Sequence, residues 1–138
     1  MSNWMASLIK LADLEVEQLQ KRLREIADRR VAVELVLESL AMEGREETAR
    51  ATLDASAGWY LVGFREGLKA RRAKADADLK VCAMEEAGAR DALSRAFEEQ
   101  KKYEMLAETA RLTATRKVAK LETAALDELA LRGRFRAA

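Results

Sequence analysis

The stretch from Met5 to Leu40 decides the fold: MASLIKLADLEVEQLQKRLREIADRRVAVELVLESL. Apolar residues recur in it at alternating steps of four and three positions, which is the a/d pattern of a coiled coil. Ten of the eleven positions in this first seam are apolar, the members being Met5, Ile9, Ala12, Val16, Leu19, Leu23, Ile26, Arg30, Val33, Leu37 and Leu40. The stretch therefore predicts one long helix with a single apolar stripe.

A second seam follows further along the chain, and the residues between the two seams lose the pattern. Within that break, Asp54, Ser56 and Gly58 are typical of a turn and of a helix start. We therefore expect an all-α fold, a long antiparallel two-helix coiled-coil hairpin forming a single domain over residues 1–138. The helices are expected over about 4–54 and 58–132, with the turn at about 54–58. The second seam contains Ala75, Leu79, Cys82, Ala89, Leu93, Ala96, Tyr103 and Ala107, and Arg72, Glu86 and Gln100 interrupt it.

The register between the two helices has two solutions. If the turn is centred on Ser56, the numbers of facing residues add up to 112 and Leu19 faces Leu93, whereas a shift by one heptad gives 119. The turn residues favour the first solution. Arg30 is the one charge in the first seam. It either pairs with Glu86, one turn from its facing position, or extends its guanidinium group to water.

The composition limits the classes of function. The chain has no proline and no histidine, and one cysteine. Without histidine and with a single cysteine, zinc fingers, disulfide frameworks and His-dependent catalysis are excluded. No glycine-rich phosphate loop is present either, so we expect no enzyme, no metal and no cofactor. Cys82 is expected in the core. A lone cysteine, together with the lack of a membrane-spanning run or signal peptide, predicts a cytoplasmic protein.

The charges are nearly balanced, with a net charge of +1, which argues against a nucleic-acid partner. Only the C-terminal end is basic, since residues 111–138 carry seven positive and three negative charges. Arg132, Arg134 and Arg136 close this segment. They form either a solvated, fraying tail or a surface that meets an acidic partner.

The most hydrophobic stretch of the chain directly follows the expected turn, where little protein is left to cover it. Exposed apolar patches tend to mark interaction sites, and Trp and Tyr are favoured interface anchors. The stretch is therefore either a partner-binding surface or a plug that folds over the turn. Its residues are Trp59, Tyr60, Leu61, Val62, Phe64 and Leu68.

These segments resemble the flagellar export protein FliJ family. Residues 7–23 (SLIKLADLEVEQLQKRL) resemble the family's N-terminal helix, and residues 59–72 (WYLVGFREGLKARR) its block after the turn, where Phe64 precedes Leu68 by four positions. Residues 101–112 and 122–135 (KKYEMLAETARL and ETAALDELALRGRF) resemble the C-terminal signature with its Leu126-Asp127-Glu128 motif. The run from 112 to 120 departs from the family pattern, because it is rich in Ala and Thr.

The resemblance implies a cytoplasmic component of the flagellar type III export apparatus, peripheral to the inner membrane. It would be a stalk-like partner of the hexameric export ATPase that also contacts the export gate membrane protein and export chaperones. The gate contact maps to Trp59, Tyr60, Leu61, Phe64 and Leu68. We place the ATPase contact at the basic end, with Arg132, Arg134 and Arg136. The alternative function is a generic homodimeric coiled-coil scaffold or adaptor; a monomer without membrane insertion is favoured.

Overall fold

The computed structural model describes residues 3–54, 56 and 58–137. Helix α1 spans Asn3–Leu53 and helix α2 spans Gly58–Ala137, and the described residues contain no strand. The predicted all-α helical hairpin is thereby confirmed. The second helix continues to Ala137, whereas the sequence pattern placed its end near residue 132.

The first helix ends at Leu53, and hydrogen bonds of the next residue, Asp54, form the turn that follows. The N–H of Asp54 donates to the carbonyl oxygen of Arg50 at 3.1 Å, which closes the last turn of α1. The Oδ1 atom of Asp54 then accepts hydrogen bonds from the N–H of Ser56 at 3.1 Å and from its hydroxyl at 2.7 Å. Aspartate favours turns through this kind of local bonding. Both bonds stabilise the carboxylate, so the pKa of Asp54 lies below its ordinary value.

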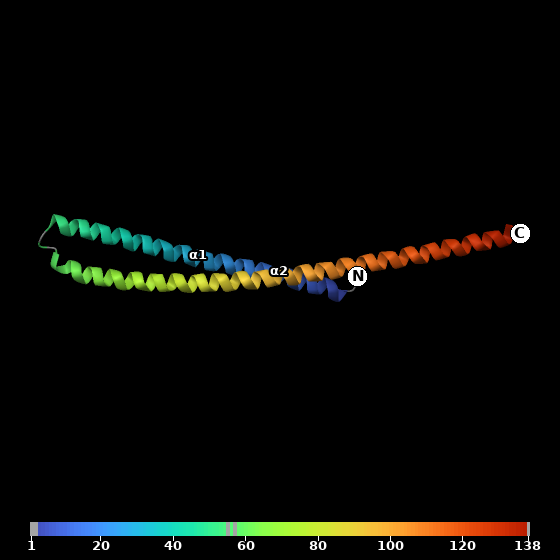
Figure 1. Cartoon of the computed structure of the whole chain (residues 1–138), viewed down its shortest axis with the longest axis horizontal. Coiled ribbons are helices and arrows are strands. Elements are labelled where there is room, and N and C mark those ends of the chain that lie inside the picture. The colour runs from blue at the N-terminus through green and yellow to red at the C-terminus, as the bar shows by residue number, and fades with distance from the viewer. Residues whose placement is uncertain (1–2, 55, 57, 138) are drawn as a thin grey trace. The chain divides into compact units, whose positions relative to one another are not determined.

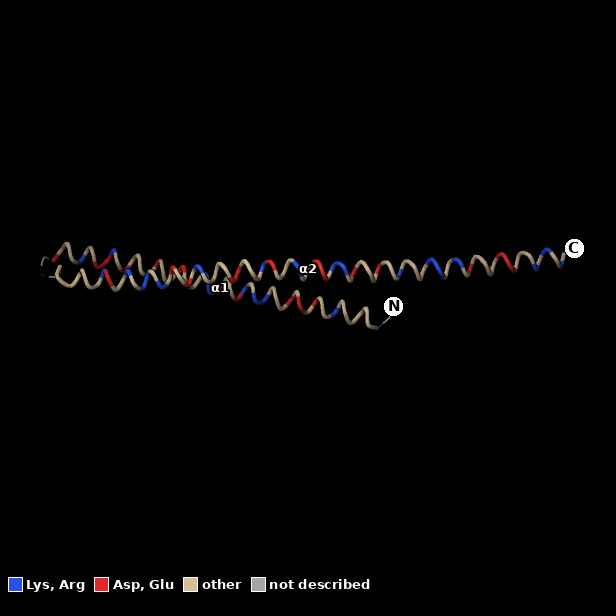
Figure 2. Tube along the Cα trace, turned by 60° about the horizontal axis from the view of Figure 1, so that its bottom comes forward, with Lys and Arg blue, Asp and Glu red and all other residues tan. Residues whose placement is uncertain are grey.

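The packing divides the chain into two compact units. The hairpin unit is Glu17–Ser94 and contains the loop, while the terminal unit combines Met1–Val16 with Arg95–Ala138. Within the hairpin unit α1 and α2 run antiparallel and side by side up to the loop (Figure 1). The same pairing is visible from a second direction in Figure 2, where charges of both signs are distributed along both helices. A single domain over the whole chain stays a prediction.

The core of the hairpin unit follows the two seams. Ile26 is the most deeply buried residue, with 1% of its surface exposed. Leu40 on α1 is also buried, as are three small residues on α2, Ala75, Cys82 and Ala89. Large side chains of α1 thus meet small ones of α2, which lets the helices approach closely. Half-buried leucine and valine side chains complete the seams: Leu19, Leu23, Val33, Leu37, Leu79 and Leu93.

Contacts between the helices select the first of the two registers. The Cδ2 atom of Leu68 lies 2.8 Å from the position that a Cβ atom would take on Gly44. These two residues face each other only if facing numbers add up to 112. The sequence left open whether Arg30 pairs with Glu86 or extends its guanidinium group to water. In the structure its guanidinium pairs with Glu86 at 3.0 Å.

Further ion pairs join the two helices on the surface of the hairpin unit. Glu86 is only 12% exposed at its side chain and also accepts from Arg90 at 2.8 Å, so it binds two arginines. Next to it, Arg29 pairs with Glu85. Because these pairs are partly solvated, each is expected to add little stability on its own.

The terminal unit is packed only over part of its length. Ala12 and Val16 of α1 are buried there, as are Ala96 and Ala107 of α2. Every described residue of α2 after Ala107 is exposed. Among the described residues, no helix is long and apolar enough to cross a membrane.

Candidate partner-binding surface at the loop

The structure divides the five residues predicted for the gate contact into two groups. Trp59, at the start of α2, is 84% exposed. Tyr60, Leu61, Phe64 and Leu68 are half-buried. Phe64 and Leu68 do share one face of α2, as their spacing predicts, and their partial burial places that face toward α1. The exposed apolar side chains beside the loop are therefore Trp59, Val62, which is 66% exposed, and Leu53 at the end of α1, which is 89% exposed.

Tyr60 is held by a polar contact to the first helix. Its hydroxyl donates to Oε2 of Glu47 at 3.1 Å, and the Oε1 atom of Glu47 accepts from Arg50 at 2.9 Å. The bond to the Glu47 carboxylate favours the neutral phenol, which raises the pKa of Tyr60. The ring of Trp59 meets the ring of Tyr60 edge to face, with centroids 6.1 Å apart. The half-buried Tyr60 thus contacts both Glu47 of α1 and the exposed Trp59.

Near the loop, the large side chain of the seam comes from α2 and the small residue from α1, the reverse of the arrangement farther from the loop. Farther from the loop α1 supplies the large side chains, whereas here α1 supplies Gly44, which leaves room for Leu68 of α2. The same register places Phe64 opposite Thr48. Sequence reasoning missed this exchange because it followed the first seam only as far as Leu40, although glycine at the next seam position was the available signal.

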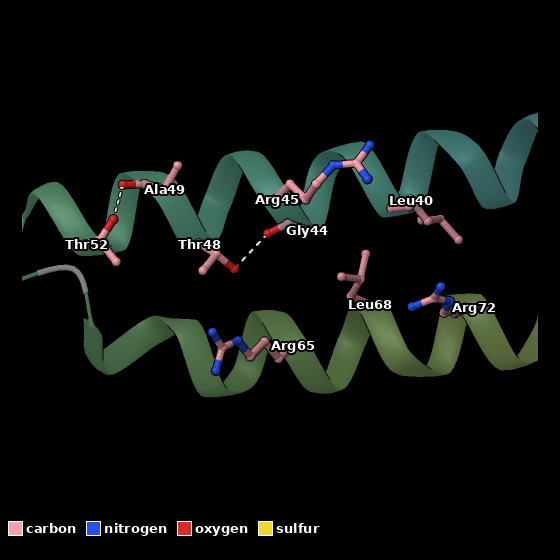
Figure 3. A pocket seen from close by; sticks show the side chains of 10 residues that line it. Leu40, Gly44, Arg45, Thr48, Ala49, Thr52, Arg65, Leu68 and Arg72 are labelled. Carbon is pink, nitrogen blue, oxygen red and sulfur yellow. Dashed lines mark hydrogen bonds between the residues drawn. The ribbon is translucent and has the colours of Figure 1, made fainter.

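An open groove runs beside this contact in the hairpin unit. Its volume is about 640 Å³. In Figure 3 Leu68 points from α2 toward α1, and the Thr48 hydroxyl bonds to the carbonyl of Gly44. Sequence reasoning did not single out this groove, because only the packing brings its two walls together. The lining residues are Leu40, Ala41, Gly44, Arg45, Thr48, Ala49, Thr52, Arg65, Leu68 and Arg72.

The three arginines predicted for the ATPase contact belong to the terminal unit, and the loop residues to the hairpin unit. Arg132 pairs with Glu128 one turn earlier in α2, at 3.0 Å. Arg134 and Arg136 lie in the last turn of the helix and are exposed. Positive charge at this end interacts favourably with the helix dipole. In the described part of the chain, no group of three or more Cys, Asp or Glu side chains could hold a metal ion.

Comparison with known proteins identifies relatives over nearly the whole chain. No family model matches it, and no solved structure matches it significantly. Two curated proteins, each named Flagellar FliJ protein and coming from two strains of Caulobacter vibrioides, are each 51% identical to the chain over 132 residues. The matched residues make up 96% of this chain and 95% of each relative. At this identity and coverage, the chain belongs to the flagellar FliJ protein family.

Proposed function

We propose that the chain is a cytoplasmic component of the flagellar type III protein export apparatus, peripheral to the inner membrane. In this proposal it is a stalk-like partner of the hexameric export ATPase and also contacts the export gate membrane protein and export chaperones. Family membership supports a flagellar role. The observation that carries the partner contact is Trp59, a large aromatic side chain that stays 84% exposed beside a packed seam.

The proposal assigns the two predicted surfaces to different partners. The loop surface, Trp59 with Tyr60, Leu61, Phe64 and Leu68, is the gate contact. The basic C-terminal turn is the ATPase contact. A monomer is proposed over a homodimeric scaffold, because a single copy already buries Ile26 within its own hairpin unit. The molecular mass in solution distinguishes the two.

A comparison of the two tryptophans tests the gate contact. Trp59→Ala removes the proposed anchor, and Trp4→Ala is the matched control, since Trp4 is 62% exposed and lies in the terminal unit. We expect Trp59→Ala to weaken binding to the cytoplasmic part of the gate protein about thirtyfold, because interface anchors typically contribute 2 kcal/mol or more. Neither substitution should change the melting temperature by more than a few degrees.

The double substitution Phe64→Ala with Leu68→Ala is a second, less selective test. Both side chains are half-buried against α1, so we expect a loss of stability in addition to any loss of binding. If Trp59→Ala binds the gate protein as tightly as the unaltered chain, the loop is not the gate contact and the apolar stretch only closes the hairpin.

A further inference from the structure

The hairpin near the loop has two edges with different charge balance. On one edge the acidic side chains of α1 are bound. Glu43 pairs with Arg71 of α2 at 3.2 Å, and Glu47 accepts from both Tyr60 and Arg50. This edge of the hairpin therefore satisfies its own charges.

The charged side chains that line the groove, in contrast, are not paired within the described part of the chain. Arg45 of α1 and Arg65 and Arg72 of α2 line it, and all three are exposed. None of them forms an ion pair with any residue that the structure describes. Three guanidinium groups thus line one groove, and no carboxylate among the described residues pairs with them, although the chain as a whole is nearly neutral.

The floor of the groove is mainly apolar. Leu40 is buried and Leu68 half-buried at its base (Figure 3). The two threonines that line it already donate their hydroxyls to carbonyl oxygens of α1, Thr48 to Gly44 at 2.8 Å and Thr52 to Ala49 at 2.7 Å. The groove therefore offers an occupant apolar contact below and positive charge at the rim.

We propose that this groove docks an acidic helical segment of a partner protein, with apolar side chains on its inner face and carboxylates at the arginines. Guanidinium groups bind carboxylates in a planar, two-pronged geometry, and three unpaired ones favour an acidic occupant. The α1 wall runs from Leu40 to Thr52, about three and a half turns, which suits a helix of similar length. Small residues on that wall let such a helix approach closely, as a third member of the coiled coil.

The groove shares Leu68 with the proposed gate contact, but Trp59, the exposed anchor of that contact, does not line the groove, so the Trp59 test distinguishes the two proposals. The proposed helix docking also differs from binding to an anionic lipid surface. A flat lipid surface would contact the arginines at the rim but would not reach the apolar floor of the groove, whereas a helix can fill the groove. The proposed ligand is thus defined by two features together, glutamate or aspartate at the rim and leucine-like side chains on the floor.

A fluorescein-labelled synthetic peptide of about 15 residues tests the proposal on the full chain by fluorescence anisotropy. Its leucines repeat at steps of three and four, and glutamates fill the flanking positions. The groove variant is Arg45→Gln with Arg65→Gln and Arg72→Gln. The matched control is Arg22→Gln with Arg24→Gln and Arg95→Gln, which removes the same charge from exposed arginines that do not line the groove.

We expect the groove variant to bind the peptide about tenfold more weakly at low salt, since three modest ion pairs are lost together. The control variant should stay within about twofold of the unaltered chain. Ala49→Trp, which fills the groove without changing charge, should also weaken binding, whereas Trp59→Ala should not. Raising the salt to about 0.5 M should reduce the difference between the two triple variants.

Three outcomes would overturn the proposal. The first is an equal loss of peptide binding in both triple variants, which would mean general charge attraction. The second is a peptide with glutamine in place of glutamate that binds as tightly as the acidic one. The third is absence of peptide binding by the unaltered chain, and in that case vesicles of phosphatidylglycerol that bind it but not the groove variant would assign the arginines to a lipid surface. None of these outcomes bears on the Trp59 test of the gate contact.

Discussion

At Gly44 the missing side chain has a structural role that the other helical glycines lack. A Cβ atom there would lie 2.8 Å from Cδ2 of Leu68, whereas a Cβ atom on Gly88 would meet no atom within 4 Å. In a helix interior, alanine is favoured over glycine by about 0.5–1 kcal/mol. Gly88→Ala should therefore raise the free energy of unfolding by this amount in urea denaturation. Gly44→Ala should gain less, because Leu68 must move.

The Leu68→Ala background supplies the control for this comparison. There the side chain that crowds position 44 is gone, so Gly44→Ala should recover the full gain seen at Gly88. Equal effects of the two glycine substitutions in the unaltered chain would show that Leu68 does not occupy the space at Gly44.

The Tyr60 hydroxyl gives a prediction on pH dependence. Its hydrogen bond to Glu47 raises the pKa of Tyr60 in the folded protein above the value of about 10 expected when unfolded. The stabilisation is therefore fully present below the unfolded pKa and is lost as the pH rises through the folded pKa. We expect Glu47→Gln to shift the Tyr60 titration toward pH 10. Ultraviolet absorbance of tyrosinate in a Tyr103→Phe background measures it, and an unchanged titration would contradict the bond.

At the scale of the elements, the seam between α1 and α2 fixes which helix faces are buried. Ile26 is 1% exposed, whereas Leu35 on the same helix is 59% exposed. We expect Ile26→Ala to lower the free energy of unfolding by about 2–5 kcal/mol, since it leaves a cavity in the packed seam where Ile26 is almost fully buried. Leu35→Ala should change it by no more than about 0.5 kcal/mol. Denaturation followed by circular dichroism compares the two, and similar losses would mean that the seam is assigned to the wrong face.

At the scale of the whole molecule, the basic end of α2 is available for a partner without loss of packing, because every described residue after Ala107 is exposed. We expect Arg132→Gln with Arg134→Gln and Arg136→Gln to leave the melting temperature unchanged. The same variant should weaken association with the export ATPase at low salt, and the effect should fade as salt screens exposed charges. Unchanged association at low salt would assign the ATPase contact elsewhere.

The sequence alone determined the helices, the turn and the buried stripe, because these follow from local periodicity. The steps of four and three from Met5 to Leu40 could fit only a helix with one buried face, and Asp54, Ser56 and Gly58 carry the chemistry of a turn. The resemblance to the FliJ family was likewise readable from the sequence, and the relatives at 51% identity confirm it.

Only the tertiary structure decided which residues face each other across the seam and which side chains stay exposed. The sequence allowed two registers, and one contact between residues far apart in the chain, Gly44 with Leu68, selected the register with the sum of 112. Apolarity at the turn did not reveal that Trp59 faces outward while Phe64 and Leu68 face inward. Direction and pairing depend on the neighbouring helix, so the groove with its unpaired arginines exists only once α1 and α2 are side by side.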